Sequence, residues 1–254
     1  MTIAIPGVDS EAFQNEGFAV VPELFTRDEV DRFRRAAERE LDPGNHNAKV
    51  GLVTTTDAWE HNEALRALAL HPRLGAVAER LAGRRLRIWG GEVLAKQPHE
   101  RTPSYLHDDQ VSSLLDSPIT FNAWIALVDV PVARGAMSFL PGSHRRPGPD
   151  RVTVADLPND AFASYLLDTW PDLQWKRRMT IPLRAGGATF HHDRTAHEAG
   201  PNTTDQIRLA FVVTFTAAEA RYRPQKGRDP LAMTAGQPID PDRYPLAGTA
   251  EAVS

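Results

Sequence analysis

The chain has 254 residues, 41% of them hydrophobic, and contains no cysteine. The lack of cysteine excludes disulfides, thiolate metal sites and cysteine nucleophiles, so any metal must be held mainly by His, Asp, Glu or backbone oxygens. The formal net charge of −4, from 29 basic and 33 acidic residues, argues against a protein that binds nucleic acid without sequence specificity, because such a protein needs a basic face.

The N-terminal third of the chain, residues 9–82, has the pattern of a helical front. Its expected elements, in chain order, are a helix capped by Asp9 or Ser10 and ended by Gly17, a short strand over residues 18–21, a helix capped by Thr26, and two helices within residues 62–82. The last two helices are separated at His71-Pro72, because proline cannot continue the hydrogen bonds of a helix.

From residue 85 the hydrophobic period changes to two, which is typical of strands. The expected strands are 85–97, 103–109, 119–130, 135–140, 179–183, 187–192 and 207–216. Many short strands without βαβ alternation predict an antiparallel sandwich or barrel with flanking helices. We expect one domain over residues 1–254, with a core at 85–217, a helical insertion at 147–178, and a proline-containing segment at 218–254 that forms an irregular wrap or a mobile lid.

A histidine followed two residues later by an acid is a candidate metal chelate. Three such pairs occur: His61/Glu63, His107/Asp109 and His191/Asp193. In a strand, side chains at i and i+2 point the same way, whereas in a helix they do not share a face. The first pair opens a predicted helix and fails this test. The second pair ends an extended stretch and passes, and Asp108 then points to the opposite face, so Asp109 is the expected ligand.

Two histidines and one carboxylate on one face of a metal form the ligand set of non-haem Fe(II) oxygenases. After His107 and Asp109, the third ligand has four candidates: His144, His191, His192 and His197. We favour His197, because Glu-Ala-Gly-Pro-Asn follows it and Arg208 comes eleven residues later, on the strand 207–216.

On that strand Arg208 shares a face with small residues, which suggests a pocket floor with a guanidinium at its mouth. An unpaired buried Arg208 would cost several kcal/mol, so it needs an anion. A dicarboxylate co-substrate would supply one through paired hydrogen bonds.

The order and spacing of these motifs resemble the phytanoyl-CoA dioxygenase family. The segments that carry the resemblance are Gly17-Phe18-Ala19-Val20-Val21-Pro22, His107-Asp108-Asp109, Ala123-Trp124-Ile125-Ala126-Leu127, the run from Gly135 to His144, and the run from Gly186 through His197 to Arg208. The resemblance covers roughly residues 11–217. It implies a double-stranded β-helix, a cupin-like jelly roll, with Fe(II) and 2-oxoglutarate at its mouth and O₂ as oxidant.

The resemblance also implies roles for individual residues. His107, Asp109 and His197 bind iron, and Arg208 binds the distal carboxylate of 2-oxoglutarate. The other residues that we expect at the co-substrate site are Lys96, Trp124, Asn122 and Thr189. Family members often place substrate contacts near His46, Thr54-Thr55-Thr56 and His61. Two residues depart from the family pattern: Ala199 replaces a serine that helps to hold 2-oxoglutarate, for which Thr189 or Thr214 could compensate, and Gly187 replaces a common aspartate.

The expected activity is oxidation of an unactivated C–H bond, normally hydroxylation, in a small metabolite or a natural-product intermediate. Desaturation, epimerisation and ring closure fit the same residues. Halogenation does not, because Asp109 is a carboxylate where related halogenases have Gly or Ala. The alternatives are an acyl-CoA hydroxylase, whose phosphates Arg145-Arg146 or Lys176-Arg177-Arg178 could bind, and a cupin-like binding protein or isomerase without oxygenase activity.

The partner that we expect is a small-molecule substrate, with neither nucleic acid nor a membrane. The opening MTIAIPGVDSEAFQ lacks the charged leader and the apolar run of a signal peptide, and there is no apolar run of 18 residues. We therefore expect a soluble, cytoplasmic protein. The sequence leaves the oligomeric state open.

Overall fold

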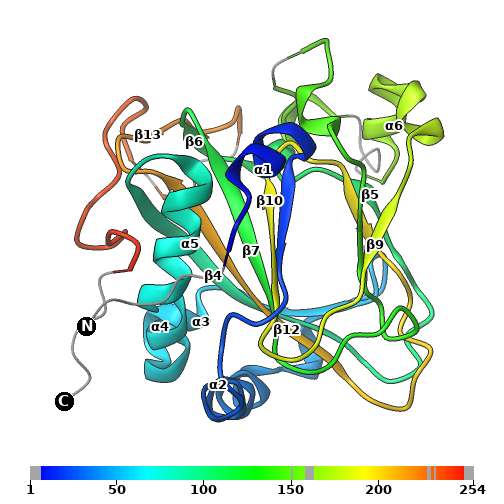
Figure 1. Cartoon of the computed structure of the whole chain (residues 1–254). Helices are drawn as coiled ribbons and strands as arrows, with labels where there is room; N and C mark the ends of the chain where they lie inside the picture. Colours follow the sequence, from blue (N-terminus) through cyan, green and yellow to red (C-terminus); the bar gives the residue numbers. More distant parts are fainter. Residues whose placement is uncertain (1–6, 150, 158–162, 228–229, 232, 249–254) are drawn as a thin grey trace.

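A computed structural model describes residues 7–149, 151–157, 163–227, 230–231 and 233–248. Its N-terminal part contains the four helices and the short strand that the sequence predicts, and also a short helix over residues 58–61 that was not predicted. The helices are α1 (Ser10–Glu16), α2 (Arg27–Glu40), α3 (Ala58–His61), α4 (Glu63–Ala69) and α5 (Pro72–Ala82). Helices α3, α4 and α5 lie along one face of the larger sheet (Figure 1).

Capping residues fix the helix ends where the sequence places them. The side chain of Asp9 accepts a hydrogen bond from the backbone of Ala12 at 2.9 Å, and Thr26 forms a capping box with Glu29. Gly17 ends α1 with φ +80°, and a Cβ atom there would lie 2.4 Å from Nδ1 of His144. Glycine is thus required at this position for both its backbone angle and its lack of a side chain.

Two antiparallel sheets face each other and form a double-stranded β-helix. The larger sheet contains, in spatial order, β1 (Phe18–Val21), β10 (Ala188–His192), β7 (Thr120–Ala126), β12 (Arg208–Ala217), β4 (Leu86–Lys96), β3 (Leu52–Thr55) and β2 (His46–Asn47). The smaller sheet contains β5 (Ser104–His107), β11 (His197–Ala199), β8 (Met137–Phe139) and β9 (Met179–Ile181). This architecture confirms the predicted fold class.

The alternation along β12 decides which side chains face the interior between the sheets. Leu209, Phe211, Val213 and Phe215 join the core packed against the helices. Ala210 and Val212 instead join a smaller apolar cluster that includes residues of both sheets. Burial of each large aromatic or aliphatic side chain contributes about 1.5–3 kcal/mol, so the helix-facing core anchors the sheet.

The insertion is less helical than predicted. Over residues 147–178 the described part contains α6 (Tyr165–Thr169) and the 3-10 turns Val154–Asp156 and Pro171–Trp175. Positions 150 and 158–162 of the insertion lie outside the described residues. Strands β2, β3 and β11 were not expected from the sequence, nor was the two-stranded sheet of β6 (Leu115–Asp116) and β13 (Arg221–Tyr222).

The C-terminal segment follows the outer side of the barrel as a wrap, as far as it is described. Its β13 pairs with β6, and Leu246 forms a bridge to Arg87 at the start of β4. Ile239 and Tyr244 are buried there, and the ring of Tyr244 stacks on Trp89. Positions 228–229, 232 and 249–254 lie outside the described residues.

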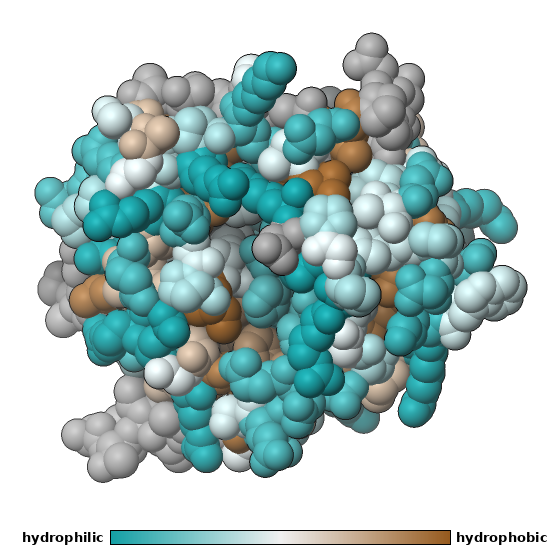
Figure 2. Space-filling view, turned by 90° about the horizontal axis from the view of Figure 1, so that it is seen from above, coloured by the Kyte–Doolittle hydropathy of each residue, from teal (hydrophilic) through white to brown (hydrophobic). Residues whose placement is uncertain are grey.

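The face seen in Figure 2 is mostly hydrophilic, with hydrophobic side chains in the recesses between polar ones. Among the described helices, none combines the length and the apolar character that crossing a membrane requires.

Candidate functional site

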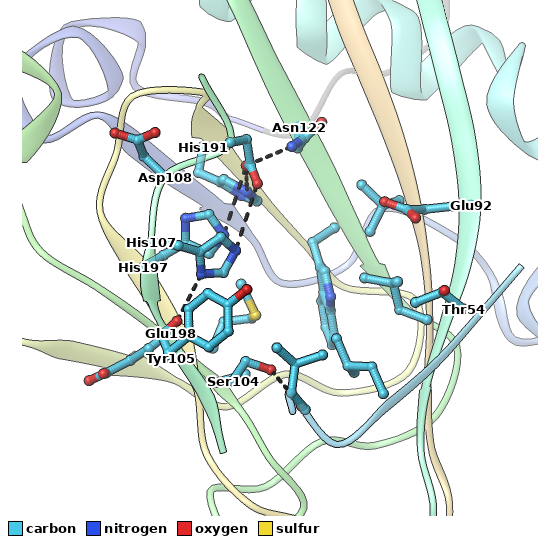
Figure 3. Close-up of a pocket in the computed structure, with 18 of the residues that line it drawn as sticks. Thr54, Glu92, Ser104, Tyr105, His107, Asp108, Asn122, His191, His197 and Glu198 are labelled. Carbon is cyan, nitrogen blue, oxygen red and sulfur yellow. Dashed lines mark hydrogen bonds and ion pairs between the residues drawn. The ribbon is translucent and has the colours of Figure 1, made fainter. Parts of the chain in front are cut away.

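The three predicted metal ligands meet where two strands of the smaller sheet run side by side. His107 ends β5 and His197 begins β11, and the antiparallel register places them directly opposite each other, with ring centroids 4.3 Å apart. Oδ1 of Asp109 lies 3.8 Å from Nε2 of His107, and Oδ2 lies 3.8 Å from Nε2 of His197. One ligand atom from each residue lies within 4.8 Å of the others, so this group could hold a metal ion (Figure 3).

Backbone carbonyls orient both imidazole rings. Nδ1 of His107 donates to the carbonyl of Tyr105 at 2.8 Å, and Nδ1 of His197 donates to that of Thr195 at 2.9 Å. This tautomer leaves the lone pair of each Nε2 directed at the group, as in metal-binding histidines. Burial lowers the pKa of both rings, so the neutral form, which binds metals, is favoured.

Asp109 reaches the histidines differently from the prediction. The strand ends at His107 rather than at Asp109, and Asp109 has right-handed helical angles of φ −83° and ψ −19°. Strand alternation therefore does not explain how Asp109 comes to lie beside the two histidines. The chain turns after His107, and the backbone N–H of Asp109 donates to the carbonyl of Asp193 at 2.7 Å.

Cross-strand neighbours in the larger sheet hold the Asp109 carboxylate. His191, Asn122 and Thr214 lie opposite one another on β10, β7 and β12. The side-chain N–H of Asn122 donates to Oδ2 of Asp109 at 2.8 Å, and Nε2 of His191 lies 3.3 Å from the same oxygen. Thr214 donates to Asn122 at 2.6 Å. Asn122, predicted as a co-substrate residue, is thus bonded to a candidate metal ligand.

The surrounding histidines keep Asp109 ionised. Burial alone opposes the charge, but His197, His191 and His107 together hold the pKa of Asp109 well below its usual value. The ionised form of Asp109 is the one that metal binding requires.

Asp108 points away from the three ligand residues, as the sequence predicts. Its carboxylate is buried in an ion pair with Arg146 and accepts a hydrogen bond from the hydroxyl of Tyr165 at 2.8 Å. The Arg146 guanidinium lies over the ring of Trp170, 4.2 Å from its centroid. Since Tyr165 and Trp170 belong to the insertion, this contact fastens the insertion to the segment that carries the candidate ligands.

Arg208 lies on β12, in the interior between the sheets. Its side chain is 1% exposed, and its guanidinium lies over the ring of Trp124, 5.5 Å from the centroid. Nε and Nη2 of Arg208 are buried without a hydrogen-bond partner among the described residues, and so is the hydroxyl of Thr189. Burial lowers the pKa of Arg208 to about 10. These unpartnered donors fit a carboxylate ligand, which would accept from the guanidinium through paired hydrogen bonds.

Lys96 and Thr189 are the cross-strand neighbours of Arg208 and Trp124 in the larger sheet. Lys96 is directly opposite Arg208 in the sheet, and its ammonium donates to the carbonyl of Thr102 at 2.7 Å. Burial, together with the charge of Arg208, lowers the pKa of Lys96 to about 7. Thr189 is opposite Trp124. Both side chains are fully buried, and neither lines the cavity between the candidate ligands and Arg208.

A cavity of about 570 Å³ connects the candidate ligands with Arg208. Trp124 and Asn122 on β7 line it. So do two residues from strands nearer the other edge of the larger sheet, Thr54 on β3 and Glu92 on β4. Figure 3 shows Glu92 and Thr54 across the cavity from the histidines. Among the other positions suggested as substrate contacts, His61 lies outside the cavity and pairs with Glu40 on the surface.

Glu92 was not predicted as a site residue. Burial, Asp109 and Asp57 raise its pKa to about 7. The available signal was strand alternation, because Glu92, Leu94 and Lys96 occupy every second position of the predicted strand 85–97 and therefore share a face. Pairing of Lys96 with Arg208 turns that face toward the interior.

The family model for phytanoyl-CoA dioxygenase (PhyH) matches residues 13–210 of the chain. The chain belongs to this family. It is 27% identical over 162 residues to phytanoyl-CoA dioxygenase domain-containing protein 1 of Mus musculus, a match that covers 62% of this chain and 54% of the mouse protein. The chain thus spans about half the length of this curated relative of the phytanoyl-CoA dioxygenase family.

Two solved structures extend the likeness over nearly the whole chain. The non-heme alpha ketoglutarate dependent carbocyclase SnoK from nogalamycin biosynthesis is 36% identical, with a TM-score of 0.84, and the match covers 94% of this chain and 95% of SnoK. The epimerase SnoN, in complex with Fe3+, alpha ketoglutarate and nogalamycin RO, is 35% identical, with a TM-score of 0.80 and coverage of 93% and 96%.

Proposed function

We propose that this member of the phytanoyl-CoA dioxygenase family is an Fe(II)- and 2-oxoglutarate-dependent oxygenase that oxidises an unactivated C–H bond of a small molecule. One observation carries the proposal: two neutral imidazoles and a carboxylate converge on one point, and a buried guanidinium with unpartnered N–H groups lines the same cavity. The first feature suits iron, and the second suits the far carboxylate of a dicarboxylate. The bound SnoN complex, at 35% identity, supports the same pair of ligands.

Each side chain has a defined task in this proposal. His107, Asp109 and His197 hold the iron on one face, which leaves its other positions to 2-oxoglutarate and O₂. Bound iron and 2-oxoglutarate supply the oxidising power that breaks the C–H bond. Arg208 anchors the co-substrate, and Trp124, beneath the guanidinium, excludes water from that ion pair.

Asn122 and His191 act on the iron through Asp109. Both contact the same carboxylate oxygen, Oδ2. They therefore fix the direction in which Asp109 presents its other lone pairs to the metal. Such outer contacts hold a metal-binding carboxylate in position.

We propose hydroxylation as the reaction, with carbocyclisation or epimerisation as the second candidate. The second candidate is favoured by one observation, the similarity to a carbocyclase and an epimerase over more than nine-tenths of the chain. All three outcomes begin with loss of hydrogen from a C–H bond. The substrate that we propose is a small metabolite or a natural-product intermediate.

An acyl-CoA substrate is less well supported. Two of the five basic side chains that would bind its phosphates already have acidic partners within the protein: Arg146 pairs with Asp108, and Arg178 pairs with Glu198. A cupin-like isomerase or binding protein would have no use for Arg208, so that residue separates this alternative from an oxygenase. We further propose that residues 1–254 act as one cytoplasmic domain that binds neither nucleic acid nor a membrane.

Anaerobic calorimetry with Fe(II) and then 2-oxoglutarate tests the proposal. We expect one iron per chain and 2-oxoglutarate binding that depends on iron. His197→Ala should lose iron binding. Arg208→Ala should keep iron but bind 2-oxoglutarate about 100-fold more weakly, and the matched surface variant Arg184→Ala should bind both normally. Iron binding that survives His197→Ala, or 2-oxoglutarate binding that survives Arg208→Ala, would contradict the assignment.

A further inference from the structure

The cavity contains one charged side chain that the proposed function does not use. The charged residues that line the cavity, among those described, are Glu92, Asp108, Asp109, Glu198 and Arg208. Asp108 is paired with Arg146, and Glu198 with Arg178. In the proposed function Asp109 binds iron and Arg208 binds 2-oxoglutarate. Glu92 is left without a counter-ion.

Among the described residues, no positively charged side chain pairs with Glu92. No hydrogen bond or ion pair joins its carboxylate to the rest of the described chain, and the charged groups that act on it most strongly are Asp109 and Asp57, which are both negative. Burial and these two carboxylates raise its pKa. Figure 3 shows the Glu92 side chain directed into the cavity rather than away from it.

The sheet register places Glu92 on the cavity wall opposite the candidate metal ligands, two strands away from Trp124. Glu92, Val212 and Trp124 are opposite one another on β4, β12 and β7, and each also lines the cavity. Neighbouring strands are about 4.8 Å apart, so Glu92 and Trp124 stand about 10 Å apart across the sheet. A small molecule that fills the space between the candidate metal ligands and β4 therefore meets the Glu92 carboxylate at one end.

We propose that Glu92 binds a positively charged nitrogen of the substrate, so that the substrate class of this site is an ammonium-bearing small molecule. The inference rests on the proposed function for the places of iron and 2-oxoglutarate. A ligand that fills the cavity removes water from the carboxylate, and a buried carboxylate without a partner is unfavourable. A neutral hydroxyl would leave an ionised Glu92 uncompensated beside Asp109 and so would favour protonation of Glu92, whereas a cationic nitrogen offsets both the loss of water and the repulsion and keeps Glu92 ionised.

The test compares two probes that differ only in charge. Choline and its neutral isostere 3,3-dimethylbutan-1-ol have the same shape, and the quaternary nitrogen of choline has no lone pair with which to bind iron. Binding of each probe is measured by anaerobic calorimetry on protein loaded with Fe(II) and 2-oxoglutarate, at constant ionic strength. We expect the unmodified protein to bind choline at least tenfold more tightly than the alcohol.

Two substitutions at the same position separate charge from shape. Glu92→Gln should weaken choline binding at least tenfold and change binding of the alcohol less than twofold, whereas Glu92→Asp, which keeps the charge, should retain the preference for choline. The matched control Glu198→Gln removes a cavity carboxylate that already has a partner, so it should retain the preference too. Thermal unfolding of each variant shows whether it is folded.

Three results would overturn the proposal: equal binding of the two probes, no binding of either probe to the unmodified protein, or a choline preference that survives Glu92→Gln. Failure of the proposed function is distinguishable in the same experiment, because it would appear as a lack of iron or 2-oxoglutarate binding before any probe is added.

Discussion

Replacing Arg208 with methionine should stabilise the protein without ligand and abolish its stabilisation by 2-oxoglutarate. The guanidinium is fully buried, with two nitrogens that lack a partner among the described residues. The fall of its pKa from 12.5 to about 10 corresponds to a cost of about 3 kcal/mol for the charged form. Loss of the contact with Trp124 removes about 1–2 kcal/mol of favourable energy, so the net gain for Arg208→Met is about 1–2 kcal/mol.

Thermal unfolding under nitrogen, with Fe(II) present, measures both effects. A gain of about 1–2 kcal/mol raises the midpoint of a chain of this size by roughly 2–8 °C. At a 2-oxoglutarate concentration 100 times its Kd, the unmodified protein should gain about 2.7 kcal/mol, whereas Arg208→Met should gain nothing. The unmodified protein should therefore be less stable than Arg208→Met without 2-oxoglutarate and more stable than it when 2-oxoglutarate is added.

Arg134→Met provides the matched control. Arg134 is also buried, but its guanidinium donates to the backbone carbonyls of Ile207 and Asp129. Its replacement leaves these carbonyls unpaired and should destabilise the protein by about 1–3 kcal/mol. The reasoning is refuted if Arg208→Met is destabilised as much as Arg134→Met, or if it gains as much stability from 2-oxoglutarate as the unmodified protein does.

Three further outcomes follow from the contacts. Asn122→Ala removes the hydrogen bond to Asp109 and should weaken Fe(II) binding about 10–100-fold in anaerobic calorimetry; unchanged affinity would exclude Asn122 as a positioning residue. Phe211→Ala should lower the free energy of unfolding in urea by about 3–5 kcal/mol, because the ring is fully buried in the helix-facing core, and a loss below 1 kcal/mol would contradict that packing. Burial lowers the pKa of His144 to about 4, so the folded state favours the neutral ring, and stability present above pH 6.5 is lost as pH falls toward 4. The full difference would be about 3 kcal/mol, which solvent at this half-buried ring reduces to about 1 kcal/mol. His144→Gln should lose that much less stability between pH 7.5 and pH 4, and an equal loss in the two proteins would show that the His144 ring is not kept neutral by burial.

Strand alternation predicted much of the interior correctly. On β12 it separated Leu209, Phe211 and Phe215, which pack against the helices, from Arg208 and Val212, which face the cavity. It worked because both faces of this strand are buried but chemically different.

The same reasoning failed where the chain turns. Asp109 lies in a turn whose geometry depends on a hydrogen bond to the carbonyl of Asp193. Because Asp193 is more than eighty residues further on, the sequence around Asp109 cannot predict that contact. Strand β3 is only four residues long and pairs with β4 along one edge. That pairing places β3, and with it Thr54, at the cavity wall. The hydrophobic pattern of β3 itself does not predict this position.

Glu92 shows a different limit. An acidic residue on a strand can face solvent or line a pocket. Which of the two occurs depends on the strands that pair with it on either side. Only the register with β12 turns Glu92 toward the cavity. His191 was left open in the sequence for the same reason, because its closeness to Asp109 depends on the pairing of β10 with β7.

The central claim is that His107, Asp109 and His197 bind one iron ion. A crystal grown under nitrogen with Fe(II) and 2-oxoglutarate, with anomalous diffraction recorded at the iron absorption edge, tests it directly. The account predicts a single anomalous peak about 2 Å from Nε2 of both histidines and from an oxygen of Asp109, with the far carboxylate of 2-oxoglutarate on Arg208. An iron peak elsewhere, or one bound by His191 in place of His197, would contradict it.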